Sequence, residues 1–189
     1  MFSKYSLISF LRIKKLKTAK VSSMKKRRPI LKIKLEAIDW VLEILTAIFV
    51  LLLIGLPIYF YGDMPDQVPS HFNAAGEPDA FGSKKSIWGL PFVGLIMAIG
   101  LTMLNRIPHL FNYPVPIDKK NARQQYRKAT RLIRAMKTVI VGAFAYIGHM
   151  SIQTALGHSK GLGNGFLIVL AVLIFGIIIF YMYRSGRRD

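Results

Sequence analysis

The stretch GFLIVLAVLIFGIIIFYMY, residues 165–183, decides the fold class of this chain. It has no charged residue and no polar face, and it has the length of about 20 residues with which a helix crosses about 30 Å of hydrocarbon. Helices in the core of a soluble protein are usually shorter and keep a polar face. The stretch therefore predicts a transmembrane helix.

Three further apolar runs precede it, so that the four predicted spans cover about 40–61, 87–104, 138–156 and 165–183. With 52% apolar residues the chain is too apolar for an ordinary soluble domain. We therefore expect an all-α integral membrane protein. Its four-transmembrane-helix bundle covers residues 37–183, between a basic cytoplasmic arm at residues 1–36 and a cytoplasmic tail at residues 184–189. The chain has no cysteine, which excludes disulfides and cysteine-ligated zinc.

The net charge of +18 is distributed unevenly along the chain. Of the 27 Lys and Arg residues, 24 lie in residues 1–43, 105–137 and 184–189, whereas Lys84, Lys85 and Lys160 lie in the two remaining loops. Because Lys and Arg of short loops are retained on the cytoplasmic side, this pattern predicts a multi-pass protein of the inner (cytoplasmic) membrane with both termini cytoplasmic. It also favours anionic lipid headgroups, rather than nucleic acid, as the partner of the basic charge.

The basic arm, residues 1–36, contains blocks of charge without a stable periodicity, which is typical of a disordered or amphipathic segment. Its first 20 residues lack the apolar core and the cleavage site of a secretory signal, so we expect no cleavage there. Met24 precedes the basic run KKRRP and is an alternative start site.

The cytoplasmic segment before the third span predicts a helix with Asp118 as its N-cap that runs on into the span. Apolar residues recur on one face of it: Ala122, Tyr126, Ala129, Ile133 and Met136. Four arginines are expected to point elsewhere: Arg123, Arg127, Arg131 and Arg134. We expect this helix to lie against lipid headgroups rather than to bind a partner. Asp39 and Glu43, one turn apart at the entrance of the first span, are expected to pair with its Arg or Lys residues.

The outward loop between the first two spans, PDQVPSHFNAAGEPDAFGSK at residues 65–84, is rich in turn-forming residues. Pro69 and Pro78 fix the backbone φ angle, while Gly76 and Gly82 allow a positive φ. The segment VPSHF followed by NAAGEP predicts a strand and a turn, as in a short β-hairpin closing near Phe81. We therefore expect a structured extracytoplasmic loop over one end of the bundle.

The same loop carries a longer sequence pattern. It reads Pro-x-x-hydrophobic-Pro-x-His-Phe-Asn, then Gly-x-Pro-Asp, then Gly-Ser-Lys, from Pro65 to Lys84. In this pattern and in its position between two spans, the chain resembles the DUF1648 family of bacterial membrane proteins over residues of about 40–103. The resemblance implies a module shared with the immunity proteins that protect bacilli against the sporulation-delaying peptide toxin. Those proteins carry further spans and a second module that we do not find in this chain.

The loop supplies the candidate residues for binding a ligand or partner: His71, Phe72, Asn73, Gly76, Asp79 and Lys84. His71, His149 and His158 all fall on the outer side with several carboxylates, and imidazole with carboxylate is a common ligand set for metals. Their spacing matches no metal motif, so we favour structural histidines and expect no cofactor, with a metal site as the alternative. The chain shows no catalytic triad in a recognisable spacing, and we expect no enzyme.

The third span has a polar face with these members: Gly142, Tyr146, His149 and Gln153. Such residues usually form hydrogen bonds between helices, and a path for a substrate is the alternative. Two functions follow. The first is sensing or immunity-type binding of an extracytoplasmic peptide or envelope partner through residues 65–84. The second is a small transporter, or an accessory subunit of one, that uses the polar face. Small residues such as Gly94 and Ala98 offer a face for a homo-oligomer.

Overall fold

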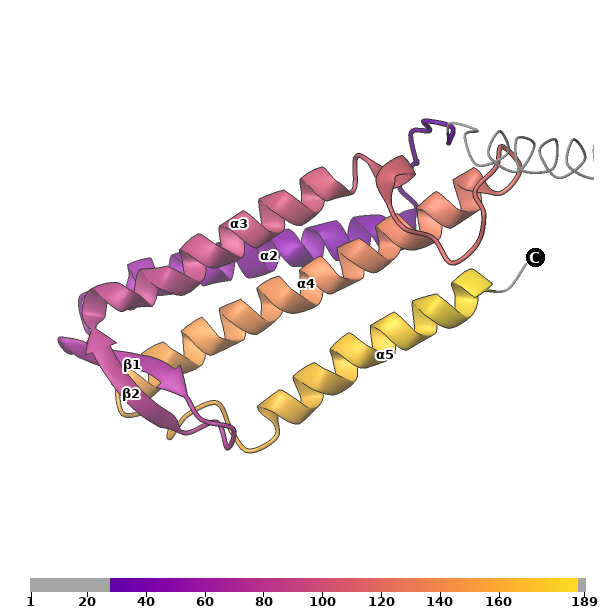
Figure 1. The fold of residues 1–189 in the computed structure, drawn as a ribbon. Helices are drawn as coiled ribbons and strands as arrows, with labels where there is room; N and C mark the ends of the chain where they lie inside the picture. The colour runs from indigo at the N-terminus through magenta and orange to yellow at the C-terminus, as the bar shows by residue number, and fades with distance from the viewer. Residues whose placement is uncertain (1–27, 187–189) are drawn as a thin grey trace, which may run out of the picture.

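A computed structural model describes residues 28–186, which form four long helices and one β-hairpin (Figure 1). The helices are α2 (Ala37–Phe60), α3 (Gly89–Leu104), α4 (Ala122–Ala155) and α5 (Phe166–Gly186). Strands β1 (Gln67–Phe72) and β2 (Pro78–Ser83) and the 3-10 helix η1 (Lys84–Trp88) lie between α2 and α3. A second 3-10 helix, η2 (Pro108–Leu110), follows α3.

The predicted spans are confirmed as four helical segments long and apolar enough to cross a membrane: Ala37–Phe60, Lys84–Leu104, Ala122–Ala155 and Phe166–Arg184. The hairpin predicted in the outward loop is confirmed as a two-stranded antiparallel sheet. Residues 1–27 of the basic arm and residues 187–189 of the tail lie outside the described residues. The predicted disorder of residues 1–27 therefore stays a prediction. Residues 28–36 form no helix or strand.

Helix α4 is the longest element, with 34 residues and a length of about 51 Å. It therefore extends well beyond one side of a hydrocarbon layer of about 30 Å. The helix begins at Ala122, so the prediction of Asp118 as its N-cap is wrong. The Asp118 carboxylate instead accepts hydrogen bonds from the backbone N–H groups of Lys120 and Asn121, at 2.8 and 3.0 Å, which closes a separate turn before the helix.

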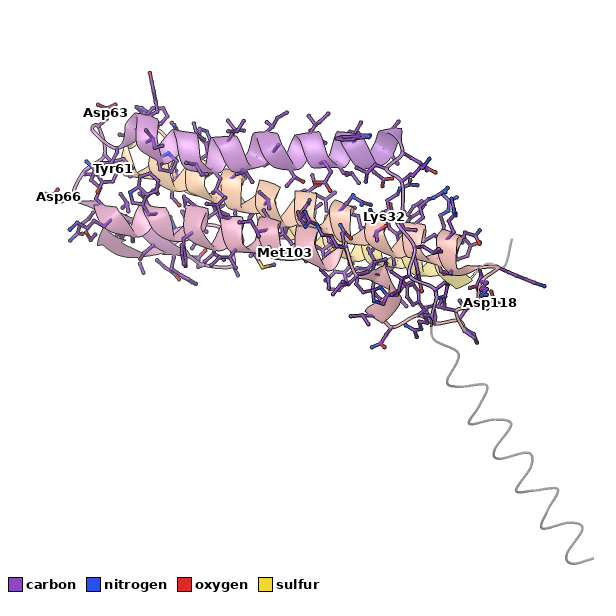
Figure 2. All side chains as sticks on the ribbon, turned by 90° about the horizontal axis from the view of Figure 1, so that it is seen from above. Lys32, Tyr61, Asp63, Asp66, Met103 and Asp118 are labelled. Carbon is purple, nitrogen blue, oxygen red and sulfur yellow. The ribbon has the colours of Figure 1, made fainter. Side chains whose placement is uncertain are left out.

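The helices run alongside one another, with α5 packed mainly on α4 (Figure 1). The hairpin and the loop between α4 and α5 lie at one end of the bundle, which we call the hairpin end. Tyr61, Asp63 and Asp66 are found there, whereas Lys32 and Asp118 lie at the opposite end (Figure 2). We call this opposite end, with residues 28–36 and 105–121, the basic end. The first and the last described residues of the chain both lie at the basic end (Figure 1).

Burial differs strongly between the helices. Buried side chains concentrate on α4, while the membrane-length window of α5 has none. Large apolar side chains such as Leu51, Phe92 and Ile168 are exposed on the outer surfaces of α2, α3 and α5. An apolar exterior of this extent indicates a lipid environment rather than water, which agrees with the predicted membrane protein.

Small residues allow the helices to approach closely. A Cβ atom on Gly142 of α4 would lie 2.9 Å from the Phe49 ring of α2, and one on Gly94 of α3 would overlap the Leu53 side chain of α2. Gly94, which was considered for a homo-oligomer face, is thus used within the bundle. Self-association of the chain stays a prediction.

Candidate functional site

The hairpin is shaped by the turn that joins its strands. The Asn73 side-chain oxygen accepts hydrogen bonds from the backbone N–H groups of Ala75 and Glu77, at 2.9 and 3.0 Å. Gly76 has a φ of 80°, a conformation that residues with a Cβ atom rarely adopt. Asn73 and Gly76 therefore act on the turn itself, and the sequence prediction that they contact a ligand has no support in their geometry.

The inner side of the hairpin is anchored in an apolar cluster. Val68 of β1 is 0% exposed and packs with Met64, Ile87 and Ile152. Because these residues come from the turn after α2, from η1 and from the end of α4, the cluster fixes the hairpin over three segments at once. Lys84 reinforces it, since its ammonium donates to the Met64 carbonyl at 2.8 Å and lies 4.7 Å from the centre of the Tyr61 ring. Lys84, a predicted binding residue, is thus an internal anchor.

The tip of the hairpin docks on the loop between α4 and α5. The Leu162 backbone N–H donates to the Gly76 carbonyl at 2.7 Å, and a Cβ atom on Gly161 would overlap that same carbonyl. Tyr146 of α4 secures the loop from the other side, because its hydroxyl donates to the Leu162 carbonyl at 2.9 Å. Two outer loops far apart in the sequence therefore form one surface.

The outward side of the hairpin carries an imidazole–carboxylate pair. The His71 Nδ1 atom lies 2.5 Å from the Asp79 Oδ1 atom, across the two strands. The side chains are 68% and 43% exposed, so both remain accessible. Phe81 follows two residues after Asp79 and is 57% exposed, while Phe72 is half-buried. His71 and Asp79 are the two predicted binding residues that the structure brings together at an open surface.

The three histidines considered for a metal site do not meet. His71 pairs with Asp79, and the His158 Nδ1 atom lies 3.2 Å from the Gln153 Oε1 atom. His149 lines a mostly apolar recess of about 360 Å³ between α2 and α4, where its buried Nδ1 has no hydrogen-bond partner. Within residues 28–186 no three His, Asp or Glu side chains gather as a metal site needs.

The predicted polar face of α4 is divided among several roles. Gly142 contacts Phe49, Tyr146 bonds to the loop after α4, and Gln153 faces His158. His149 lines the recess, and its Nδ1 atom is buried without a hydrogen-bond partner among the described residues. The sequence predicts hydrogen bonds between helices for this face, but Tyr146 and Gln153 each bond to the loop that follows α4, and the Nδ1 atom of His149 has no partner within residues 28–186.

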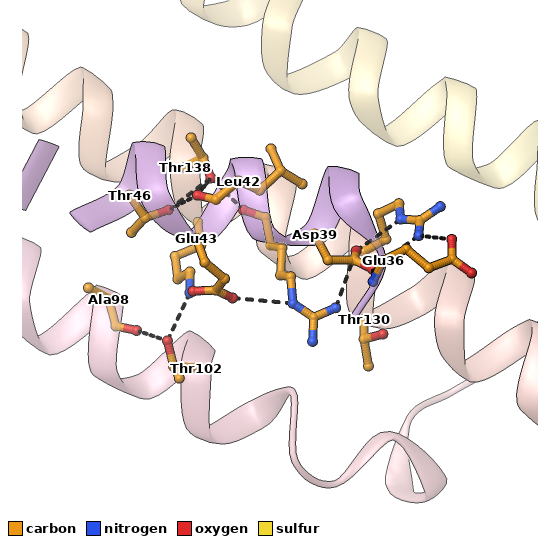
Figure 3. Close-up of polar contacts among 12 residues, drawn as sticks. Glu36, Asp39, Leu42, Glu43, Thr46, Ala98, Thr102, Thr130 and Thr138 are labelled. Carbon is orange, nitrogen blue, oxygen red and sulfur yellow. Dashed lines mark hydrogen bonds and ion pairs between the residues drawn. The ribbon is translucent and has the colours of Figure 1, made fainter. Parts of the chain in front are cut away.

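A second polar cluster lies at the basic end, where α2 and α4 face each other (Figure 3). We call it the ion-pair ladder. The N-cap residue of α2 and two carboxylates within α2 meet four cations of α4: Glu36, Asp39 and Glu43 with Arg127, Arg131, Arg134 and Lys137. The predicted pairing of Asp39 and Glu43 with cations of this helix is confirmed.

The cations of the ladder become more buried toward the bundle centre, from Arg127 with 41% of its side chain exposed to Lys137 with 1%. Arg131 binds Asp39 with two donors, Nε at 2.9 Å and Nη2 at 3.0 Å. The Lys137 ammonium, 1% exposed, donates to Glu43 at 2.6 Å and to the Thr102 hydroxyl of α3 at 2.9 Å. Next to it the hydroxyls of Thr46 and Thr138 lie 2.9 Å apart. The ladder thus joins α2, α3 and α4.

Two aspects of the ladder differ from the sequence predictions. Arg134 was expected to point away from the packed face, but it is 7% exposed and its Nε donates to Glu43 at 3.2 Å. Lys137, Thr46 and Thr102 were not identified as partners. One signal in the sequence could have identified them. They lie in the helical turns between a charged segment and an apolar run, and a polar side chain at such a place needs a partner inside the bundle.

The arm also has a defined contact at the basic end. The Arg28 guanidinium donates to the carbonyls of His109 and Phe111, at 3.2 and 2.5 Å, and lies 5.5 Å from the centre of the Tyr113 ring. Burial raises the pKa of the Tyr113 phenol, with Tyr126 adding to the effect and Arg28 opposing it. The phenol therefore stays protonated, and its hydroxyl donates to the Pro108 carbonyl at 2.8 Å.

Comparison with known proteins identifies the hairpin region. Residues 48–95 match the family described as DUF1648, a domain of unknown function. They form a DUF1648 domain. A protein of Archaeoglobus fulgidus described as uncharacterized is similar to this chain, with 29% identity over 154 residues, which cover 75% of this chain and 84% of that protein. No solved structure matches the chain. The bacterial source and the link to immunity proteins stay predictions.

The DUF1648 domain corresponds to one end of the molecule. It spans the second half of α2, the hairpin, η1 and the start of α3. It contains Val68, the His71–Asp79 pair and the Gly76 carbonyl, whereas their supports Ile152 and Leu162 lie outside it. The ion-pair ladder also lies outside it. The domain is therefore completed by α4 and the loop that follows α4.

The contact between the hairpin tip and the α4–α5 loop is testable with Gly161→Ala. The added Cβ atom would overlap the Gly76 carbonyl, at a residue whose φ is 147°. We expect the Leu162 amide to exchange its hydrogen at least about tenfold faster, since losing a buried hydrogen bond costs about 1–3 kcal/mol.

The matched control is Gly165→Ala in the same loop, where a Cβ atom would have no neighbour within 4 Å. Hydrogen exchange of the purified protein, followed by mass spectrometry, compares the two variants. Equal protection of Leu162 in Gly161→Ala and in the unaltered chain would show that the tip is not docked.

Proposed function

We propose that this chain is a multi-pass protein of the cytoplasmic membrane that senses or neutralises an extracytoplasmic peptide or envelope partner by binding it with the hairpin. The observation that carries the proposal is the two-sided character of the hairpin. Its inner side is fixed by Val68, Lys84 and Gly76, while its outer side leaves the His71–Asp79 pair open. A surface held in one shape binds without the cost of ordering a loop.

The exposed groups indicate the chemistry of the partner. Asp79 and Phe81 are two residues apart on β2, so their side chains leave the strand on the same face. An aromatic ring beside an imidazole–carboxylate pair suits a partner with an apolar segment and a neighbouring N–H donor or cation. A short amphipathic peptide has this composition. The likeness of the loop to the module of peptide-toxin immunity proteins supports the same class.

The direction in which the hairpin faces follows from the charges. Among the described residues, the Lys and Arg side chains of residues 28–36 and 105–137 and of Arg184 lie toward the basic end, and only Lys84, Lys85 and Lys160 lie at the hairpin end. By the retention of basic loops in the cytoplasm, the hairpin end is extracytoplasmic and both termini are cytoplasmic. The lack of cysteine makes this orientation simple to test.

Single cysteines at Ala75→Cys and Lys119→Cys test the orientation, since both positions are exposed and lie at opposite ends. We expect a membrane-impermeant maleimide to label the Ala75→Cys chain in intact cells and the Lys119→Cys chain only after lysis. Labelling in the reverse order would contradict both the orientation and the proposed function.

The binding surface is testable by photo-cross-linking in living cells of the native host. A photoreactive amino acid replaces the exposed Ala80, and the adduct is measured with and without the double substitution His71→Ala and Asp79→Asn. We expect the substitutions to weaken binding about tenfold, as for central residues of an interface, and the adduct to fall accordingly.

The matched control for this experiment is Asp66→Asn, which removes another exposed carboxylate of the same loop. It should leave the adduct unchanged, because Asp66 supports the hairpin through its backbone carbonyl, which accepts from Lys84 N–H at 2.8 Å. Absence of any adduct at Ala80, or an equal loss in Asp66→Asn, would contradict binding by the His71–Asp79 pair.

Transport is the second candidate function, and one observation favours it. His149 lines the recess between α2 and α4, and its buried Nδ1 has no partner within residues 28–186; ionisable groups inside a bundle often belong to a path for a substrate or a proton. A cellular phenotype lost in His149→Leu but kept in His71→Ala would select transport. The opposite pattern selects binding at the hairpin.

A further inference from the structure

The interface between α4 and α5 contains two pockets of different character. The one nearer the hairpin end has a volume of about 650 Å³ and is lined mostly by apolar groups of α4 and α5. Tyr146 of α4 and Phe49 of α2 also line it. The other, at the basic end, has a volume of about 270 Å³ and is lined by charged and aromatic side chains. Both open between the same two helices.

The two pockets follow the same helix interface, which we call the groove. Arg131 and Thr138 of α4 line the basic and the apolar pocket respectively, and they are seven residues apart. Phe180 and Leu173 of α5 line the same two pockets and are also seven residues apart. Since seven residues are about two helical turns, each pair lies on one face of its helix. The pockets therefore follow each other along the α4–α5 interface.

The basic pocket has more positive than negative charge. Its cations are Arg127, Lys128, Arg131 and Arg184, and Glu36 is the one carboxylate among its lining residues. Asp39, which does not line the pocket, pairs with Arg131 and neutralises its charge. Lys128 and Arg184 have no carboxylate partner within residues 28–186, and the Lys128 ammonium donates to the Arg184 carbonyl at 2.6 Å.

A second observation at this pocket concerns Arg127. Its Nη1 binds Glu36 at 2.5 Å, but its Nε is buried and has no hydrogen-bond partner in the described part of the chain. A buried donor without an acceptor is costly, so this N–H indicates an acceptor that residues 28–186 do not supply. Together with the surplus cations, it suits the oxygens of a phosphate group.

The apolar pocket indicates what accompanies that phosphate. Most of its lining, Thr138 to Tyr146 of α4 and Phe166 to Leu173 of α5, belongs to predicted spans, where the surrounding medium is hydrocarbon. An empty space of this size forfeits packing on its walls. Water is not retained in an apolar space. From Arg131 of the basic pocket to Gly142 of the apolar pocket, α4 rises about 16 Å, which matches a chain that crosses one leaflet of about 15 Å.

We propose that the groove between α4 and α5 binds one anionic phospholipid, with its phosphate at Arg127, Lys128 and Arg184 and one acyl chain in the pocket lined by Phe49 and Tyr146. A soluble phosphate would account for the basic pocket alone, and a neutral lipid for the apolar pocket alone. One phospholipid supplies both parts. This site is independent of the hairpin, so its failure leaves the proposed function untouched.

The headgroup is tested with the full-length protein, stripped of lipid in detergent and titrated with dioleoyl phosphatidylglycerol or dioleoyl phosphatidylcholine. Native mass spectrometry counts the bound lipid. We expect at least about tenfold tighter binding of the phosphatidylglycerol, and loss of this preference in the double variant Lys128→Gln, Arg184→Gln. Neither Lys128 nor Arg184 is part of the ion-pair ladder, so the bundle of the double variant should remain folded. Circular dichroism of the purified variant checks its helix content.

The matched control is Arg123→Gln, which removes an exposed cation of α4 that does not line the groove. It should keep the full preference for phosphatidylglycerol. An equal loss in Arg123→Gln would show general attraction to a basic surface, and no preference in the unaltered protein would overturn the site.

The acyl chain is tested with Leu170→Trp, which fills the apolar pocket, against Ile168→Trp on the exposed side of α5. We expect Leu170→Trp alone to weaken phosphatidylglycerol binding, about tenfold. Inorganic phosphate at the same concentration should not displace the lipid. Full displacement by phosphate, or equal binding in the two tryptophan variants, would contradict a phospholipid site.

Discussion

The contact between Lys137 of α4 and Glu43 of α2 is the interaction on which the rest of this structure depends. A buried ammonium group without a partner is unstable in an apolar bundle, so α2 and α4 must lie in the register that brings the two side chains to 2.6 Å. The Thr102 hydroxyl adds α3 to the same point. Apolar packing alone leaves helices in lipid free to slide, because the lipid tails are as apolar as the side chains. The ladder supplies the missing specificity.

The register set at the basic end determines the surface at the other end. With α2 and α4 fixed, Met64 after α2 and Ile152 near the end of α4 come together under Val68, and the DUF1648 hairpin settles over them. The loop after α4 then reaches the hairpin tip at Gly76. Helix α5 leaves that loop and returns along α4, and it does not pack closely on α2. This arrangement leaves the groove between α4 and α5. The outer surface and the groove are thus both consequences of where α4 lies.

Much of this architecture follows from the sequence because its causes are local. The apolar runs predict the helices, the prolines and glycines of residues 65–84 predict the hairpin, and Asp39 and Glu43 beside a span require cations. The start of α4 was misplaced because Asp118 caps a turn as readily as a helix. Arg134 was misplaced because periodicity treats every arginine as a surface residue. The roles of Lys84 and Gly76 depend on segments far along the chain, Met64 and Leu162, and no local pattern contains them.

A charge exchange between positions 43 and 137 tests the central claim most directly. The free energy of unfolding would be measured for Glu43→Lys, for Lys137→Glu and for the two substitutions together, with the protein in detergent. Each single change should lower it by about 3–5 kcal/mol, because it leaves like charges facing each other in a buried place. The account predicts that the double variant recovers at least half of this loss. Additive losses in the double variant would show that the pair does not fix the register of α2 and α4.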